Sequence, residues 1–310
     1  MKRILPALGL IIGLLMVFSG KVFAQQEPMY SQYMFNGLIL NPAYAGSTEG
    51  LSAAALYRNQ WVGVEGAPVT QTLSVHAPIE KKNIGLGLSI INDKIGVTNT
   101  WRMNGSYAFR IRTNTGLLSM GLQAGLAKNH ADYTQLALDP QGNPDAQFNE
   151  VQNSLIFYFG PGLYYYTGKF YAGVSSPNFL RAPITDLEGD ASYPKHARHY
   201  FLTTGYVFDV SENLQVKPST LVKIAEGAPV QFDLNTNVWF YNLVGLGASY
   251  RTNNGLVGIL ELQLAKQFRL GYSYDQPVSK VSRYTANTHE LMLRFDLFSG
   301  HQQDNSPRLF

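Results

Sequence analysis

Two histidines, three residues apart, are the first candidates for chemistry in this sequence. On a helix, His196 and His199 would share one face, as two ligands of a metal ion must. Lys195 and Arg198 flank the pair, and their positive charges oppose a bound cation. No nearby carboxylate cluster completes the ligand set. We therefore expect a solvated loop here and no metal site.

A serine and a histidine on one strand face raise the possibility of hydrolysis. Ser74 and His76 are two residues apart, so a strand would point both side chains to the same side. A hydrolase would also need an orienting acid or amide, and the G-x-S-x-G motif of nucleophile elbows does not occur. We expect a structural histidine and no catalytic residue. An outer-membrane enzyme that depends on His76 is the least favoured alternative.

Cofactor motifs are missing from the sequence. The run 139–145 contains two aspartates but lacks the alternating acids and terminal glutamate of an EF-hand. No glycine-rich loop followed by Lys and Ser or Thr is present to hold phosphate. With no cysteine, thiolate ligands and disulfides are excluded. We expect no cofactor.

A compact polar and aromatic cluster, Arg58-Asn59-Gln60-Trp61, spans the end of the first predicted strand, with Arg58 in the strand and Trp61 just past it. One interpretation is a snorkelling arginine beside a tryptophan at the membrane interface. The other is a docking point for the N-terminal segment or for a periplasmic partner. The sequence leaves both open.

The first 24 residues have the order of a secretory signal peptide. Lys2 and Arg3 precede an apolar run from Ile4 to Phe18, and small residues before Ala24 offer a cleavage site. Removing the three basic residues of this segment from 24 leaves 21, equal to the 21 acidic residues. The mature chain is then close to neutral, so the composition gives no reason to expect nucleic-acid binding.

The rest of the chain alternates apolar and polar residues. Between 100 and 112, Trp101, Met103, Tyr107 and Phe109 occupy odd positions, whereas the even positions are polar or small. This period of two predicts β-strands with one apolar face. Charged residues make up only 15% of the chain, against about 25% in soluble domains. We expect an all-β, transmembrane antiparallel barrel in the bacterial outer membrane, in contact with its lipid.

Similar runs predict about fourteen strands, an even number as bacterial barrels require. They lie near 51–59, 68–77, 83–92, 99–112, 116–128, 153–166, 169–176, 199–210, 213–225, 229–240, 242–251, 255–265, 267–275 and 288–298. Short turns are expected at 113–115, 167–168 and 252–254. Longer loops are expected near 93–98, 129–152, 177–198 and 276–287.

A soluble β-sandwich would also alternate, but three features disfavour it. Many predicted strands exceed the usual five or six residues of globular sheets. Charged residues such as Arg102 and Asp233 stand in the middle of strands. Aromatic residues such as Trp61 gather near strand ends, as in the girdles of membrane barrels.

The segment between the signal peptide and the first strand is too apolar for a solvated tail. We divide the chain into a signal peptide (1–24), an N-terminal periplasmic or plug segment (25–50), the barrel (51–298) and a C-terminal tail (299–310). The plug segment is expected inside the lumen or against the periplasmic rim. A fifteenth strand or a short helix is the alternative.

Several motifs resemble a known family. They are Tyr30-Ser-Gln-Tyr-Met-Phe-Asn36, Leu40-Asn-Pro-Ala-Tyr-Ala-Gly46, Leu56-Tyr-Arg-Asn-Gln-Trp61, His76-Ala-Pro78 and Ile84-Gly-Leu-Gly-Leu88. Together they resemble the opening signature of the PorP/SprF family of Bacteroidota. The resemblance implies an outer-membrane component of the type IX secretion system, with roles in secretion or surface anchoring of sorting-domain proteins such as gliding adhesins.

The resemblance also implies partners. These are secreted cargo with a C-terminal sorting domain and periplasmic components linked to peptidoglycan. Candidate partner-binding residues are Tyr30, Gln32, Tyr33, Phe35, Asn41, Pro42, Tyr44, Arg58, Gln60 and Trp61. Loops 129–152 and 177–198 are candidates for outer contacts. The alternative function is a channel or transporter for small solutes, similar to fatty-acid transporters with an N-terminal plug.

Overall fold

The computed structural model describes residues 28–79, 82–135, 151–184, 197–252, 255–278 and 287–297. The expected signal peptide and C-terminal tail lie outside these residues. Within the described ranges, no helix is both long and apolar enough to cross a bilayer.

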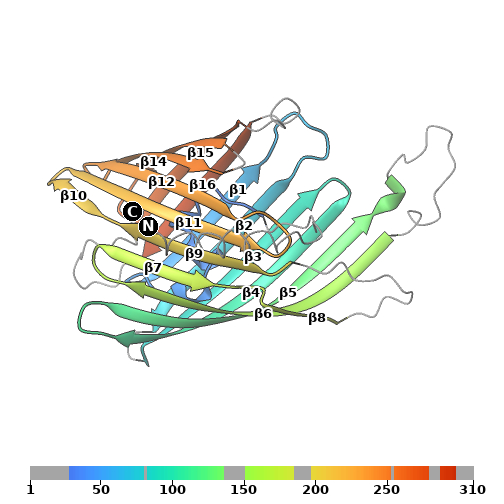
Figure 1. Ribbon diagram of the computed structural model, residues 1–310, viewed down its shortest axis with the longest axis horizontal. Helices are drawn as coiled ribbons and strands as arrows, with labels where there is room; N and C mark the ends of the chain where they lie inside the picture. Colours follow the sequence, from blue (N-terminus) through green and yellow to red (C-terminus); the bar gives the residue numbers. More distant parts are fainter. Residues whose placement is uncertain are drawn as a thin grey trace, which may run out of the picture.

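The described residues form one antiparallel sheet of sixteen strands that closes into a barrel (Figure 1). Closure occurs where β16 pairs with β1, from Leu51 opposite Leu297 to Asn59 opposite His289. The strands are β1 (Leu51–Asn59), β2 (Val69–Ile79), β3 (Ile84–Ile95), β4 (Thr98–Arg112), β5 (Leu117–Asp132), β6 (Val151–Tyr166), β7 (Phe170–Ser175), β8 (Leu180–Pro183), β9 (His199–Tyr206), β10 (Phe208–Ser211), β11 (Leu214–Ala225), β12 (Gln231–Phe240), β13 (Val244–Arg251), β14 (Gly255–Gln263), β15 (Phe268–Pro277) and β16 (Thr288–Leu297).

The sixteen strands occupy fourteen positions around the wall, which we call staves, because two staves are each divided into two shorter strands. The strands β7 and β8 both pair with β6, and β9 and β10 both pair with β11. The strands β7 and β8 therefore form one stave, and β9 and β10 form another. The prediction of a fourteen-stranded outer-membrane barrel is confirmed.

Both interruptions lie opposite a proline. Ser176 donates its backbone N–H to the carbonyl of Pro161 in β6 at 3.0 Å, and Pro161 has no N–H to donate in return. Beyond this point, two residues of β6 face four residues of the β7–β8 stave, so the register changes. Pro218 of β11 stands at the gap between β9 and β10, where the register is the same on both sides. One proline thus bulges a stave, and the other only removes a hydrogen bond.

The two faces of the wall differ as the period of two predicts. In β5, Leu122 and Leu126 are exposed on the outside, whereas Ser119 and Gln123 are buried inside. Since lipid cannot pair with backbone groups, the sheet must close, and its outward residues must be apolar. The outward positions therefore meet lipid, and the inward positions line a polar lumen.

The connections are distributed unequally between the rims. Turns at 113–116 and 167–169 belong to the rim where β1 begins and β16 ends. In outer-membrane barrels the short-turn rim faces the periplasm and the long loops lie outside. The loop expected at 93–98 is wrong: β3 reaches Ile95 and β4 starts at Thr98, because Gly96 takes a positive φ of 55° and permits a tight turn. This turn lies on the long-loop rim, as do the end of β13 and the start of β14.

We predict a depth-dependent cost for charge on the outer face. Replacing Leu122→Arg, in the middle of β5, should lower the free energy of unfolding by about 2–4 kcal/mol, because the guanidinium meets hydrocarbon. The matched control, Ile111→Arg, lies on the same outer face at the rim, one residue from the end of β4, and should cost about 0–1 kcal/mol. Denaturant unfolding in lipid vesicles, followed by tryptophan fluorescence, measures both. Equal costs would contradict a lipid-facing position for Leu122.

Candidate functional site

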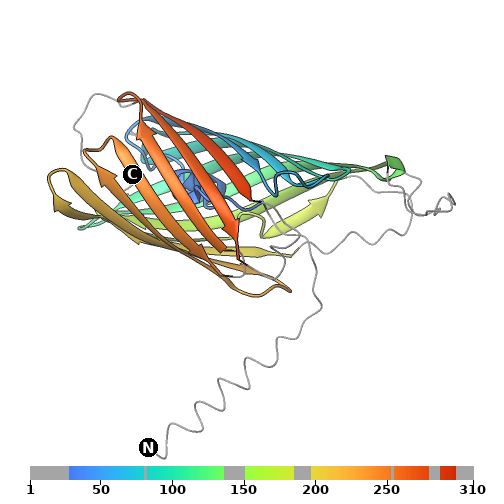
Figure 2. The same cartoon turned by 90° about the horizontal axis from the view of Figure 1, so that it is seen from above.

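The N-terminal segment lies inside the barrel. Its described part forms three short 3₁₀ helices, η1 (Tyr33–Phe35), η2 (Gly37–Ile39) and η3 (Pro42–Tyr44). Figure 2 shows these turns, in blue, enclosed by the strands. Most of their side chains are buried. We call residues 28–50 the plug.

The Asn-Pro sequence shapes the end of the plug nearest the short turns. Asn41 is extended, as a residue before proline prefers, and its Oδ1 accepts a hydrogen bond from the Ala43 N–H at 2.9 Å. Pro42 begins η3, where its missing N–H costs nothing. The Asn41 amide nitrogen also donates to the carbonyl of Leu163 in β6 at 2.9 Å. One residue therefore caps η3 and ties it to the wall.

Close packing against the wall holds the same end. A Cβ on Gly121 of β5 would lie 2.2 Å from the backbone nitrogen of Ala43, so only glycine allows this contact. The ring of Tyr44 packs edge-on against Tyr164 of β6, with ring centroids 5.4 Å apart. This end of the plug is fixed mainly by shape.

Charged groups hold the other end. Arg58 at the end of β1 donates to Asp275 of β15 at 2.7 Å and to Glu290 of β16 at 2.9 Å. The backbone N–H groups of Ser31 and Gln32 donate to the same Glu290 carboxylate at 2.9 and 2.8 Å. The plug thus completes a buried hydrogen-bond network whose other members belong to the wall.

The wall of this region carries a surplus of negative charge. Asp233 of β12 accepts from Arg251 of β13 at 2.8 Å, and Arg251 also donates to the Tyr30 carbonyl at 3.0 Å. Two guanidinium groups therefore face three carboxylates. The surplus is met by N–H and O–H donors of the plug, and buried charges require such donors. We call Arg58, Asp233, Arg251, Asp275 and Glu290 the acidic latch.

The part of the wall next to the acidic latch carries a surplus of positive charge. Arg269 faces Glu261 at 4.0 Å and Arg294 faces Asp296 at 2.9 Å, while Lys217 adds a third cation. Here the plug supplies acceptors. The Phe35 carbonyl accepts from Arg294 at 3.1 Å. The Phe35 ring lies 5.7 Å from the Lys217 ammonium, within the range of a cation–π contact. The plug therefore presents hydrogen-bond donors to the acidic part of the wall, and a carbonyl and an aromatic ring to the basic part.

Ser74 and His76, the pair considered for hydrolysis, both serve the plug. The Ser74 hydroxyl donates to Asn36 Oδ1 at 3.0 Å. His76 Nδ1 accepts from the Gly46 N–H at 3.2 Å, and its ring lies edge-on to Tyr44 at 5.3 Å. The two side chains are engaged with different parts of the plug.

Tyr33 is also tied to the wall, since its hydroxyl accepts a hydrogen bond from the amide of Asn235 in β12. Burial, reinforced by the nearby Asp233 carboxylate, raises the pKa of the Tyr33 hydroxyl well above its usual value. The group therefore stays neutral in the lumen.

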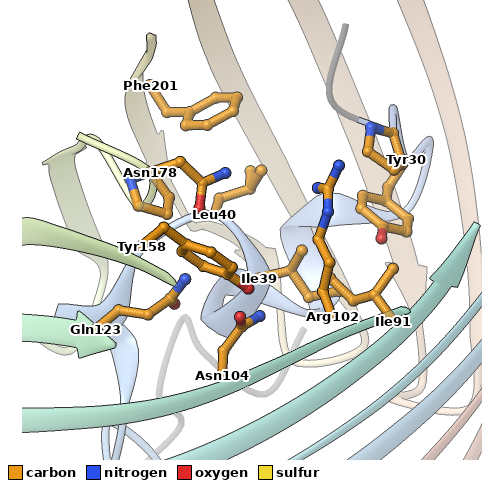
Figure 3. A pocket seen from close by; sticks show the side chains of 12 residues that line it. Tyr30, Ile39, Leu40, Ile91, Arg102, Asn104, Gln123, Tyr158, Asn178 and Phe201 are labelled. Atoms are coloured by element: carbon orange, nitrogen blue, oxygen red, sulfur yellow. The ribbon is translucent and has the colours of Figure 1, made fainter. Parts of the chain in front are cut away.

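Two small cavities lie inside the barrel: plug and wall residues together line the first, and residues of β4, β5, β6 and the β7–β8 stave line the second. Each has a volume of about 30 Å³, room for one or two water molecules. Figure 3 shows the first, where Arg102, Asn104 and Tyr158 of the wall face Ile39 and Leu40 of the plug. Neither cavity has the 300 Å³ or more typical of small-molecule sites.

The structure separates the predicted partner-binding residues into two groups. Eight are buried in the lumen and contact the barrel itself: Tyr30, Gln32, Tyr33, Phe35, Asn41, Pro42, Tyr44 and Arg58. Gln60 and Trp61 are partly exposed on the long-loop rim. Contact between the buried eight and another protein would require the plug to leave the barrel.

The position of Arg58 decides between the two interpretations of the cluster Arg58-Asn59-Gln60-Trp61, a snorkelling arginine or a docking point. It is 1% exposed and bonds to Ser31, so it does not snorkel to the interface but docks the N-terminal segment. Trp61 lies on the rim opposite the periplasmic turns, and its backbone N–H donates to Thr288 Oγ1 at 3.3 Å. A periplasmic partner cannot reach it there when the long loops face outward.

The remaining members of the acidic latch were not predicted as site residues. Asp233, Arg251, Asp275 and Glu290 come from four strands that are far from the plug in sequence. In the sequence, each of them is a charged residue at a position where the alternation predicts an inward side chain. This pattern predicts that the residue lies in the lumen but does not identify its partners.

The fold and the filled lumen define a bacterial outer-membrane β-barrel closed by its own N-terminal plug. The chain belongs to the PorP/SprF family of type IX secretion system membrane proteins, whose sequence model matches residues 22–295. No curated protein matches the chain.

Solved structures with similar shape have low sequence identity. The Ralstonia pickettii toluene transporter TbuX is 11% identical, with a TM-score of 0.48 over 89% of this chain and 95% of its own. Acinetobacter baumannii Omp33 is 10% identical, with a TM-score of 0.46 over 80% and 98%. The Pseudomonas putida toluene transporter TodX is 12% identical, with a TM-score of 0.43 over 88% and 93%. At these TM-scores, no property of those proteins transfers to this chain.

Gly121→Val should displace the plug and leave the barrel folded. The added side chain would collide with the backbone of η3. Because the chain has no cysteine, a Leu38→Cys substitution in the buried part of η2 reports the displacement through its reactivity with a charged thiol reagent. Gly105→Val is the matched control, since Gly105 faces outward with open space. Equal reactivity of the two variants would contradict the packing described.

Arg58→Gln should destabilise the folded protein by about 3–5 kcal/mol, since it leaves the buried Glu290 carboxylate without its cation and Asp275 with only Arg251, 3.7 Å away. Lys169→Gln removes the cation of an exposed pair with Asp209 and should leave stability almost unchanged. Denaturant titration in detergent micelles compares the two variants. A stable Arg58→Gln protein would show that the acidic latch does not depend on this ion pair.

Proposed function

We propose that this protein is a non-enzymatic interaction component of the type IX secretion system. In the outer membrane it holds or hands over exported proteins that carry a C-terminal sorting domain, gliding adhesins among them. Periplasmic components linked to peptidoglycan contact its short-turn rim. Family membership supports the secretion role, and the named cargo and partners are the proposal.

The filled lumen is the observation that favours interaction over transport. The plug is hydrogen-bonded to the wall at both ends, and each of the two cavities described above has room for only one or two waters. A solute channel would need a continuous wet path. Recognition by the outer surfaces of the barrel fits a lumen occupied by the plug better than flux through it does.

One side of the barrel is tall enough to offer such a surface. The strands β5 and β6 have 16 residues each, whereas about 9–11 cross a bilayer. Figure 1 shows the far ends of these two strands extending beyond their neighbours. These ends stay paired and polar, with hydrogen bonds between the side chains of His130 and Asn153 at 2.9 Å and of Asn129 and Ser154 at 3.1 Å. We call residues 128–132 and 151–155 the β5–β6 tip. We assign cargo recognition to this tip. Most residues of loops 129–152 and 177–198, which the sequence proposed for outer contacts, lie outside the described residues.

A secretion assay in the native host tests this proposal. Cells without the protein should retain a sorting-domain reporter in the periplasm, and the wild-type chain should restore its surface display. The double variant His130→Glu and Asn153→Glu should restore display poorly, because it replaces the hydrogen-bonded pair at the β5–β6 tip with two carboxylates that repel each other. The matched control, Asn114→Glu with Asn213→Glu, places charges on exposed positions of the short-turn rim.

The outcomes separate the alternatives. Full display in cells without the protein would refute the secretion role. Loss of display only with the short-turn variants would place recognition on the periplasmic side. Solute-dependent conductance of the wild-type protein in planar bilayers would support the channel instead.

A further inference from the structure

An apolar groove crosses the lipid-facing side of the wall near β1. Its volume is about 440 Å³, within the range of sites that hold small molecules. Outward residues of β1, β2, β3 and β16 line it, with Ala55 at the floor and Leu73 and Leu293 on either side. We call it the β1 groove.

Small side chains on β1 create the groove. Ala55 stands directly between Leu73 of β2 and Leu293 of β16, and Ala53 occupies the same place one row closer to the periplasm. Each alanine leaves a depression between larger neighbours. The groove is centred on Ala55, and the depression at Ala53 lies one row beyond its lining on the same lipid-facing surface.

The outer end of the groove is polar and aromatic. The row above Ala55 contains Tyr57, Gln71, Asn92 and Trp101, side by side on successive strands. Because β1 ends at Asn59, this row lies near the long-loop rim. Amide and aromatic side chains at that depth suit the boundary between acyl chains and headgroups.

Cations stand at the headgroup level. Lys94 is the next outward residue after Asn92 on β3, and Lys128 of β5 is directly opposite Trp101. Both lysines are exposed. An apolar groove with lysines beyond its polar end is complementary to a lipid that carries a phosphate.

We propose that the β1 groove is a binding site for a phosphate-bearing lipid of the outer leaflet. One acyl chain lies along Ala53 and Ala55, and the phosphate lies between Lys94 and Lys128. The site does not involve the plug and shares only Lys128 with the β5–β6 tip. Ala55 lies outside that tip, so Ala55→Phe tests the lipid site without changing the proposed cargo surface.

Photolabelling of the full mature chain tests the site. The protein is placed in phosphatidylcholine vesicles that contain a small fraction of an anionic phospholipid with a diazirine in its acyl chain. Label should concentrate on peptides of β1 and β2. Ala55→Phe should reduce it severalfold by filling the groove, whereas Ala248→Phe, an equivalent outward position on β13, should not.

The lysines are tested separately. Lys94→Gln with Lys128→Gln should remove the preference for the anionic probe over a zwitterionic one, and Lys169→Gln on the opposite rim should not. Heat-modifiable migration on gels confirms that each variant is folded. Label spread evenly around the barrel, or undiminished by Ala55→Phe, would overturn the proposal. Native mass spectrometry that finds a lipoprotein anchor in place of a free lipid would overturn the assigned source.

Discussion

The pairing of backbone N–H and C=O groups inside hydrocarbon is the constraint on which this structure depends. An open sheet edge in the membrane would leave such groups unsatisfied, so the strands must close into a cylinder. Closure produces a lipid-facing exterior and a polar interior. Pro161 and Pro218, which have no backbone N–H to donate, stand opposite the two interruptions of the wall.

A polar interior creates a second requirement, since buried charges need partners. The wall carries an acidic surplus near Arg58 and a basic surplus near Arg294, and the plug meets the first with N–H donors and the second with a carbonyl and an aromatic ring. Segment and barrel therefore stabilise each other. With the lumen filled, the surfaces left for recognition are the rims and the outer wall.

Local patterns predicted the strands closely. The span 51–59 matches β1 at both ends, and most other boundaries differ by a few residues. Larger differences have local causes. The expected loop at 93–98 is a two-residue turn because Gly96 adopts a positive φ, and β8 exists because the stave bulges opposite Pro161. Hydrophobic periodicity cannot detect either feature, since both depend on single backbone groups.

The sequence by itself determined the barrel, because side-chain alternation along a strand is a local property that one chain displays at every position. It also marked the plug segment and Arg58 as special. Only the tertiary structure decided that Arg58 meets Ser31, Asp275 and Glu290, which are up to 259 positions apart along the chain. Such contacts exist only after the ends of the sheet have joined, and no local pattern encodes which inward residues then face one another.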